Sequence, residues 1–352
     1  MKKKISVLLI ITLLITGICS LSGCSKKDKL YVFNYGDYIA PEVYDMFEKE
    51  YGIQVIYDEY ATPEDMYAKF TSGTAKYDLI CTSDYMIEKL IGEDLLSELD
   101  FSKIENYKNI SQSQVDMSKK FDSENKYSIP HFWGTLGILY NTKTVSAESV
   151  KTWNVVFDEK YSEKIIMPNS ERDAFFVALS HLRLDPNTTN KEDLAKARDL
   201  LIAQKKHVQA YLMDEAARVK LEAENADIAV VYNGEAYLAF ENNKDLAFAI
   251  PETGTCTWVD SFVMPKNVEN KESAEKFLNF LCREDIAKIN FEYIYYSTPN
   301  QAVINSLSEE VLNESAIFPS KEIQENATVL RYLGKEMEQH YSSLWKEVKS
   351  AQ

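Results

Sequence analysis

Cysteine and histidine are scarce in this chain, which has five cysteines and four histidines among 352 residues. Beyond residue 24, cysteine occurs only at Cys81, Cys256 and Cys282, without CxxC spacing or a neighbouring histidine. An odd number of cysteines at such distances argues against a zinc site and against a disulfide framework, and it leaves room for one bridge at most. The histidines are scattered singly, so we expect no metal site. They are His131, His181, His207 and His340.

Catalytic signatures and internal repeats are also missing. The sequence contains no G-x-S-x-G nucleophile elbow, no H-E-x-x-H motif and no phosphate-binding glycine loop. We therefore expect neither an enzyme nor a cofactor. A hydrolase that uses paired carboxylates, as in glycoside cleavage, is the enzymatic alternative that this pattern leaves open. The lack of repeats argues against a surface adhesin.

Positive charge is in deficit, with 39 Lys and Arg residues against 55 Asp and Glu residues and a formal net charge of −16 at pH 7. Such a surface repels nucleic acid and anionic lipid, so we expect no nucleic-acid partner. It would attract a cationic ligand over a distance, although solubility alone would also account for the charge.

Only one long apolar run occurs, and it lies at the N-terminus. Lys2, Lys3 and Lys4 precede the apolar run from Ile5 to Ile18, and Leu21-Ser22-Gly23-Cys24 follows. This order is typical of a secretory signal, and the run is too short to span a bilayer comfortably. The last four residues resemble the bacterial lipobox, in which the cysteine is lipidated and becomes the first residue.

The lipobox predicts where the protein resides. We expect residues 1–23 to be a lipoprotein signal peptide and residues 24–28 to be a tether that begins with the lipidated Cys24. The protein would then be held at the cell membrane, on the extracytoplasmic face, by its acyl chains alone. In a cell with an outer membrane this location is the periplasm.

Short apolar strands alternate with amphipathic helices along the rest of the chain, which is long enough for two domains. The first strand is expected at Leu30–Tyr35, followed by a helix that starts at Pro41 and stops at Gly52. Further strands are expected at 54–57, 78–81, 137–141, 164–167, 227–232 and 259–265, with helices between them and a last helix over 321–349. This alternation predicts two α/β lobes with largely parallel sheets, joined by more than one crossover.

Aromatic and acidic residues gather at the expected carboxyl ends of these strands, where open α/β sheets bind their ligands. Aromatic rings attract ammonium groups by roughly 0.5 to 2 kcal/mol per contact, and carboxylates add charge-assisted hydrogen bonds. In Trp258-Val259-Asp260, strand alternation places the indole and the carboxylate on one face. Alternatively, Trp258 is core and Asp260 caps a turn. The strand ends, at 34–38, 82–85, 170–173, 232–235 and 258–260, predict a small organic cation as the ligand.

Motifs along essentially the whole chain beyond the signal carry a family likeness. They are Tyr31-Val32-Phe33-Asn34-Tyr35-Gly36-Asp37-Tyr38, Tyr67-Ala68-Lys69, Tyr77-Asp78-Leu79, Tyr127-Ser128-Ile129-Pro130, Trp133-Gly134, Tyr232-Asn233-Gly234, Trp258-Val259-Asp260-Ser261, Phe277-Leu278-Asn279-Phe280-Leu281 and Ser297-Thr298-Pro299-Asn300. With these motifs the chain resembles the spermidine/putrescine-binding proteins of bacterial ABC importers, the PotD-like group. The resemblance implies a type II periplasmic-binding-protein fold, in which two α/β lobes close by a hinge on a ligand cleft. It also implies a monomer that captures a polyamine and delivers it to ABC permease subunits.

The resemblance also implies a set of ligand-binding residues. The aromatic box of the family falls on Tyr35, Tyr38, Tyr85, Tyr232, Trp258 and Tyr296. Tyr35 and Tyr232 stand where the family commonly has Trp, which gives less stacking area and adds a hydroxyl. Ser83 matches a hydroxyl near one amine, and Asp260 matches the central acid that contacts an amine nitrogen.

The chain departs from the family pattern at two places. Ser170 and Asp173 stand where the family often has Asp and Glu, so ligand contact and a purely structural capping box are equally open for this pair. A family Gln falls on Leu330, where nothing is carried over. Both changes affect groups that determine ligand length, so the choice between spermidine and putrescine stays open.

The family plan also predicts how the chain divides into lobes. The first lobe would comprise residues 29–136 and 257–300, and the second residues 137–256 and 301–352. The main alternative keeps this fold with another small organic cation or an amino acid as cargo. An amino acid needs an Arg for its carboxylate, and Arg172 is the only Arg near the strand ends; we expect it to support the acids of the site through an ion pair.

Overall fold

The computed structural model describes residues 28–351. The predicted signal peptide, the tether up to residue 27 and the lipidation site at Cys24 lie outside the described residues. Among the described residues, no helix is long and apolar enough to cross a membrane.

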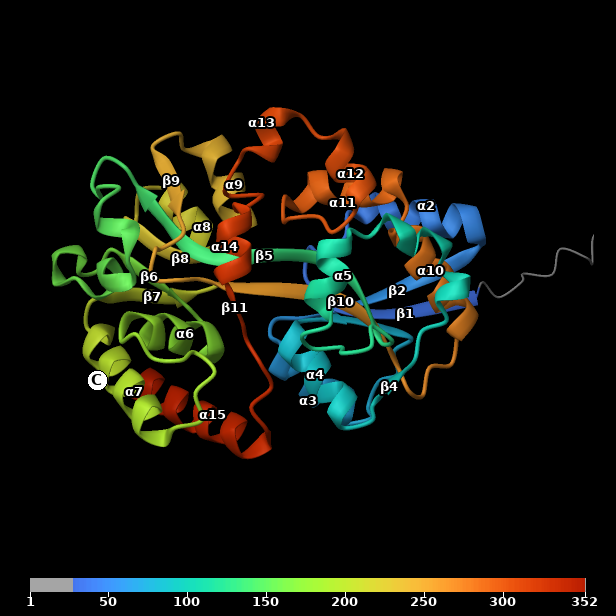
Figure 1. Cartoon of the computed structure of the whole chain (residues 1–352), viewed down its shortest axis with the longest axis horizontal. Coiled ribbons are helices and arrows are strands. Elements are labelled where there is room, and N and C mark those ends of the chain that lie inside the picture. Colours follow the sequence, from blue (N-terminus) through green and yellow to red (C-terminus); the bar gives the residue numbers. More distant parts are fainter. Residues whose placement is uncertain (1–27, 352) are drawn as a thin grey trace, which may run out of the picture.

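The described chain is a mixed α/β structure, whose elements are numbered as in Figure 1. The strands are β1 (Asp28–Tyr35), β2 (Ile53–Tyr60), β3 (Leu79–Thr82), β4 (Leu96–Ser97), β5 (Ser128–Asn141), β6 (Ile165–Pro168), β7 (Val208–Leu212), β8 (Ile228–Tyr232), β9 (Leu246–Ala249), β10 (Cys256–Pro265) and β11 (Thr328–Val329). The α-helices are α2 (Pro41–Tyr51), α3 (Pro63–Thr71), α4 (Asp84–Gly92), α5 (Gln112–Ser118), α6 (Glu171–His181), α7 (Lys191–Lys205), α8 (Asp214–Glu222), α9 (Asn233–Asn242), α10 (Lys271–Leu281), α11 (Glu284–Ile294), α12 (Gln301–Ser306), α13 (Glu309–Leu312), α14 (Lys321–Asn326) and α15 (Lys335–Ser350).

The strands form one continuous sheet in the order β2-β1-β3-β10-β5-β8-β6-β7, with β4 and β11 also paired to β10 and β9 paired to β5. β1, β2 and β3 are parallel, as are β6, β7 and β8, whereas β5 and β10 are antiparallel to each other, β10 is antiparallel to β3, and β5 is antiparallel to β8. β5 pairs with β10 from Ser128 to Thr135 and with β8 from Leu136 onward. The two long strands therefore link both groups of parallel strands, and Figure 1 shows them crossing the middle of the molecule.

Helices cover both faces of the sheet in each lobe. In the first lobe, Val32 contacts the cluster that contains Phe47 and Phe277, while Phe33 contacts the cluster that contains Met86 on the opposite face. This follows from the alternation of side chains along a strand. In Figure 1, α2 and α10 lie on one side of β1 and β2, and α3 and α4 lie on the other. In the second lobe, on one face of β6 to β9, α6, α7 and α15 surround a core that includes Trp153, Phe175, Phe176 and Tyr341. α8 and α9 pack on the other face, where Ala217, Leu221, Ala236 and Ala239 are buried.

Local sequence signals account for several helix ends. α2 begins with Pro41 and ends at Gly52, which has a φ of 71° and whose N–H donates to the Glu48 carbonyl. The hydroxyl of Thr62 caps α3 by accepting the N–H of Asp65. The start of α2 at Pro41 and its stop at Gly52 are those expected from the sequence.

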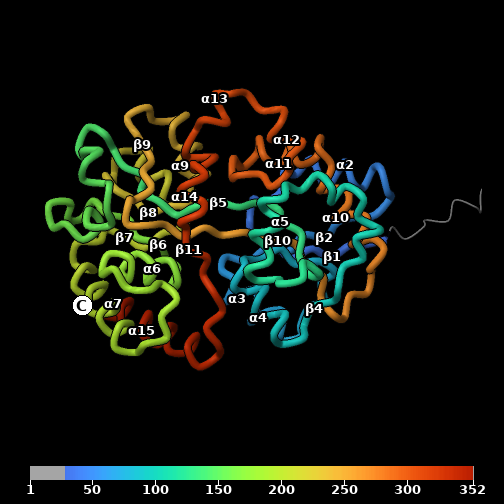
Figure 2. Tube along the Cα trace, viewed as in Figure 1, coloured from blue at the N-terminus to red at the C-terminus, as the bar shows by residue number. Residues whose placement is uncertain are grey.

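The C-terminal region differs from the expectation of one helix over 321–349, which is wrong. It consists of α14, the short strand β11 and α15, and Figure 2 shows the trace running between them. Thr328 and Val329 pair with Cys256 and Thr257 of β10, and Gly334 breaks the helical path with a φ of 86°. The sequence pattern also missed β7 and β9. It made β5 too short, because β5 continues through apolar and polar residues alike.

Candidate ligand-binding site

The site lies at the carboxyl ends of the parallel strands, next to the middle of β10. Tyr35 ends β1 and Tyr38 follows it, Ser83 and Tyr85 follow β3, and Asp173 follows β6. Tyr232 ends β8, Trp258 and Asp260 belong to β10, and Tyr296 follows α11. The expected residues therefore come from both lobes and from one of the strands that join them.

The rings of the site contact each other in a continuous row. Tyr35 lies with its ring centroid 5.2 Å from that of Tyr38, and Tyr38 lies 5.9 Å from Tyr296. Tyr296 and Trp258 meet edge to face at 5.1 Å, as do Trp258 and Tyr232 at 5.5 Å. Such tilted pairs leave ring faces for other partners. The row joins the first lobe to the second through Trp258.

Each of several tyrosine hydroxyls in the site donates to a carboxylate. Tyr38 donates to Asp260 at 2.5 Å and Tyr232 donates to Asp173 at 2.7 Å. The same relationship joins Tyr85 to Glu64 at 2.9 Å and Tyr296 to Glu235 at 3.5 Å. Aromatic faces and carboxylates thus lie side by side, which is the surface that an organic ammonium ion prefers.

Burial makes these carboxyl groups costly to ionise in the absence of a cation. Asp260 is buried, and burial raises its pKa to about 7 against the effect of the Tyr38 hydroxyl. Burial also raises the pKa of Asp173, with the hydroxyls of Tyr232 and Ser170 acting in the other direction. A cation placed between these groups would offset that desolvation. The electrostatics therefore favour a positively charged ligand.

Two polar atoms of the site are buried without a hydrogen-bond partner among the described residues. They are the hydroxyl Oγ of Ser83 and the indole Nε1 of Trp258. Both atoms are therefore available to form a hydrogen bond with a polar group of a ligand. Ser83 stands at the N-cap of α4 but makes no capping hydrogen bond with its side chain.

Ser170 and Asp173 have different surroundings. The Ser170 hydroxyl accepts the N–H of Asp173 at 3.3 Å and so caps α6. The Asp173 carboxylate instead faces the hydroxyl of Tyr232. The capping interaction is present, and ligand contact by either residue stays a prediction.

Sequence reasoning missed four acids and misjudged one arginine. Glu235 and Asp84 stood among the strand-end residues without being singled out, while Glu64 and Asp214 gave no signal. Glu235 contacts Tyr296 and is paired with Arg218 at 2.8 Å. Burial raises the pKa of Asp84 to about 8. Asp214 follows β7 and lies near enough to Glu235, Asp173 and Asp260 to interact with their charges.

Arg172 does not form the expected ion pair with an acid of the site, as far as the described residues go. Its guanidinium carbon lies over the rings of Tyr85 and Tyr341, at 5.5 Å and 5.1 Å, and Nη1 donates to the carbonyl of Arg331. Burial raises the pKa of Asp173, and the positive charge of Arg172 acts in the opposite direction, although no ion pair is formed between these two described residues. The arginine thus supports the acids from a distance.

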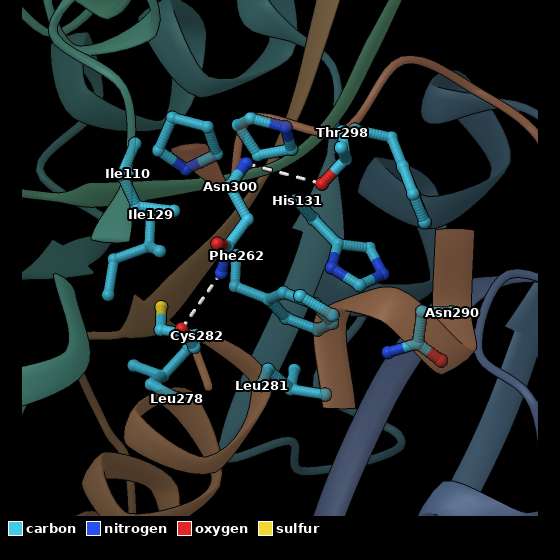
Figure 3. A pocket seen from close by; sticks show the side chains of 14 residues that line it. Ile110, Ile129, His131, Phe262, Leu278, Leu281, Cys282, Asn290, Thr298 and Asn300 are labelled. Atoms are coloured by element: carbon cyan, nitrogen blue, oxygen red, sulfur yellow. Dashed lines mark hydrogen bonds between the residues drawn. The ribbon is translucent and has the colours of Figure 1, made fainter. Parts of the chain in front are cut away.

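A separate small cavity is lined by residues of β5, β10, α10 and α11 (Figure 3). It has a volume of about 20 Å³ and is lined by His131, Asn290, Thr298 and Asn300 together with apolar side chains. This is room for one water molecule. Burial lowers the pKa of His131 to about 4, so the imidazole is neutral. The cavity is too small for an organic ligand.

Among the described residues, no group of His, Cys, Asp and Glu is arranged to hold a metal ion.

The chain is similar in sequence to a family of bacterial binding proteins and to named relatives in it. Residues 42–319 match a family model described as bacterial extracellular solute-binding protein. The spermidine/putrescine-binding periplasmic protein of Salmonella typhimurium is 34% identical over 301 residues, which cover 85% of this chain and 86% of the relative.

Solved structures agree in fold. The spermidine/putrescine ABC transporter substrate-binding protein PotD of Streptococcus pneumoniae matches with a TM-score of 0.78 and 35% identity, over 92% of this chain and 98% of the other. The TpPotD lipoprotein of Treponema pallidum matches with a TM-score of 0.80 and 26% identity, over 91% and 99%. These findings confirm the predicted family and the predicted two-lobed α/β fold. The chain belongs to the bacterial extracellular solute-binding proteins, in the PotD-like group, and has their type II fold.

Proposed function

We propose that this chain captures a polyamine, spermidine or putrescine, outside the cytoplasmic membrane and delivers it to the permease of an ABC transporter without chemical change. The observation that carries the proposal is the alternation of tyrosine rings and carboxylates, in which Tyr38 pairs with Asp260 and Tyr232 with Asp173. The names of the Salmonella and Streptococcus relatives support the same ligand class.

The chemistry of a polyamine suits both parts of this arrangement. Its methylene segments would lie against ring faces, each buried methylene contributing about 0.8 kcal/mol, and its ammonium groups would face the carboxylates. Asp260 contributes from the middle of the row of rings and Asp173 from the second lobe. Selection between polyamines would then depend on where the acids stand, because methylenes alone discriminate weakly.

Ten residues form the proposed ligand site. They are Tyr35, Tyr38, Ser83, Tyr85, Ser170, Asp173, Tyr232, Trp258, Asp260 and Tyr296. Glu235 joins them as a carboxylate that faces Tyr296, although its pairing with Arg218 already balances its charge.

The lobe division expected from the sequence is also part of the proposal, with residues 29–136 and 257–300 in the first lobe. One contact shifts the expected boundary at residue 300, because α12, at 301–306, packs against α11 and so goes with the first lobe. The tether at Cys24, which keeps a monomeric protein near its permease, belongs to the proposal as well. The Treponema relative, named a lipoprotein, supports it.

A thermal-shift panel on the ligand-stripped protein tests the ligand class. Putrescine and spermidine should each raise the melting temperature in a saturable way, because a ligand that binds only the native state stabilises it. An acidic amino acid and a neutral sugar serve as comparators. If only the amino acid raised the melting temperature, the amino-acid alternative would replace the polyamine proposal. Turnover of a model glycoside would support a hydrolase instead.

A further inference from the structure

One face of α4 points its side chains at the second lobe. Tyr85, Glu88 and Lys89 stand at positions i, i+3 and i+4, which share one side of a helix. Each of the three contacts a residue that belongs to the second lobe or to the segment that enters it. α4 itself belongs to the first lobe, where Met86, Ile87 and Leu90 fill the core.

The innermost of these contacts is an ion pair between Lys89 and Glu338. The ammonium Nζ of Lys89 lies 2.7 Å from the Glu338 carboxylate, and only 8% of the lysine side chain is exposed. The ammonium also lies 3.6 Å from the ring centroid of Tyr67 and 5.8 Å from that of Tyr332. A buried ammonium is tolerated when it is paired and surrounded in this way, and it is costly when a partner is withdrawn.

The second contact joins Glu88 to Arg331. Both carboxylate oxygens of Glu88 accept hydrogen bonds from the guanidinium, and one of them also accepts the backbone N–H of Tyr332 at 2.9 Å. Planar two-point pairs of this kind are the stronger type of ion pair.

The partners of α4 are firmly attached to the second lobe. Asn187 donates to the carbonyl of Val329 at 2.9 Å and accepts the N–H of Arg331 at 3.0 Å. The carbonyl of Arg331 accepts a hydrogen bond from Arg172 of α6. Glu338 belongs to α15, which packs along α7. A separation of the lobes would therefore strain or break the ion pairs of α4.

The same helix begins at the site. Ser83 occupies its N-cap position and Tyr85 stands in its first turn, where the Arg172 guanidinium lies over the Tyr85 ring. Arg172 is followed in the chain by Asp173, which belongs to the proposed ligand site. The lobe-to-lobe contact therefore starts beside that site and continues along α4 to Lys89.

We propose that Glu88 and Lys89 of α4, with Arg331 and Glu338, form an ion-pair latch that holds the lobes closed and slows ligand release. The proposal rests on the proposed function, since it concerns regulation of the same site. The latch acts on the equilibrium between open and closed forms rather than on the ligand itself. Loss of one pair is expected to speed the release of every bound polyamine by the same factor, about tenfold.

The test compares the full-length protein with Glu338→Gln, Lys89→Met and the double variant. Spin labels, one in each lobe, measure the distance between lobes without ligand, and stopped-flow fluorescence measures the release of putrescine and spermidine. We expect both single variants to be more open and to release both ligands about tenfold faster, and the double variant to be no worse than either one.

The matched control is Lys76→Met with Glu269→Gln, because Lys76 and Glu269 form an exposed ion pair within the first lobe. The control should keep the wild-type distance and release rates. Unchanged distances and rates in Glu338→Gln would overturn the latch, as would acceleration for one polyamine only. Absence of polyamine binding by the wild type would instead refute the proposed function, and the ligand-free distance would still decide on the latch.

Discussion

The hydroxyl of Tyr38 donates to the carboxylate of Asp260 at 2.5 Å, and this contact joins the loop after β1 to the middle of β10. Because β10 also pairs with β5, which continues into the second lobe, Asp260 stands on the framework that connects the lobes. Its carboxylate is buried, and no cationic side chain is paired with it among the described residues. An ammonium group of the ligand would supply the missing positive charge.

Replacement of this carboxylate tests its role. Asp260→Asn is expected to weaken polyamine binding by roughly 2 to 5 kcal/mol, because a buried ammonium would lose its charged partner. Calorimetric titration measures the change. Asp245→Asn is the control, since Asp245 is partly exposed and pairs with Lys143. Equal affinity in wild type and Asp260→Asn would remove Asp260 from the ligand site.

The raised pKa of Asp260, about 7, makes binding dependent on pH. Below that value the carboxyl group is protonated and cannot pair with an ammonium, so affinity should rise about tenfold from pH 6 to pH 8. Binding near pH 7 should also release protons. Titrations in buffers of different ionisation enthalpy measure both effects, and an affinity that falls with rising pH would contradict this account.

The same shift affects stability with a definite sign. The folded-state pKa of Asp260 lies above its usual range, so its contribution to stability is complete below about pH 4 and is lost as pH rises through about 7. Because the ionised carboxylate binds polyamine more tightly, the polyamine-induced rise in melting temperature should be larger at pH 8 than at pH 6. Asp260→Asn should lose most of this difference. Melting curves with and without putrescine measure it.

Two glycines leave room for the row of rings. A Cβ on Gly134 would lie 2.1 Å from Asn233 Oδ1 and 2.6 Å from the Trp258 ring, and one on Gly234 would lie 2.2 Å from the Tyr296 ring. Gly134→Ala and Gly234→Ala are thus expected to displace the rings, at a cost of about 1 to 3 kcal/mol in stability, and to weaken polyamine binding.

Gly92→Ala is the control for these substitutions, because nothing lies within 4 Å of its added Cβ. Unfolding curves and titrations of the three variants separate the two effects. If Gly134→Ala and Gly234→Ala bound polyamine as tightly as Gly92→Ala, the rings would not be part of the site.

Tyr232 tests the pairing in the second lobe. Tyr232→Phe keeps the ring and removes the hydroxyl that donates to Asp173, leaving a buried carboxylate with one donor fewer. The expected result is a loss of about 1 to 3 kcal/mol in the free energy of unfolding and a further rise in the pKa of Asp173. Denaturant unfolding measures the first effect. Tyr293→Phe, at an exposed ring, should change little, and an equal change in both variants would contradict the pairing.

The sequence predicted much of the fold because its signals are local. Pro41 and Gly52, for example, bound α2 as the sequence indicates. The C-terminal region was mispredicted because its path depends on pairing between Thr328 and Cys256, which are far apart in the chain. The family resemblance supplied Tyr296, and the structure brings it to Trp258.

The acids of the site were harder to predict for the same reason. Glu235 contacts Tyr296 and Glu64 contacts Tyr85 only after folding, and no spacing in the sequence indicates either contact. Asp214 follows β7, a strand without a clear apolar pattern. Aromatic motifs were therefore easier to assign than the carboxylates that face them.

Calorimetric titration of ligand-stripped protein with putrescine and spermidine, side by side, tests the central claim most directly. The account predicts saturable binding with one ligand per chain, and displacement of either polyamine by the other. No binding of either polyamine by a protein that still melts cooperatively would contradict it.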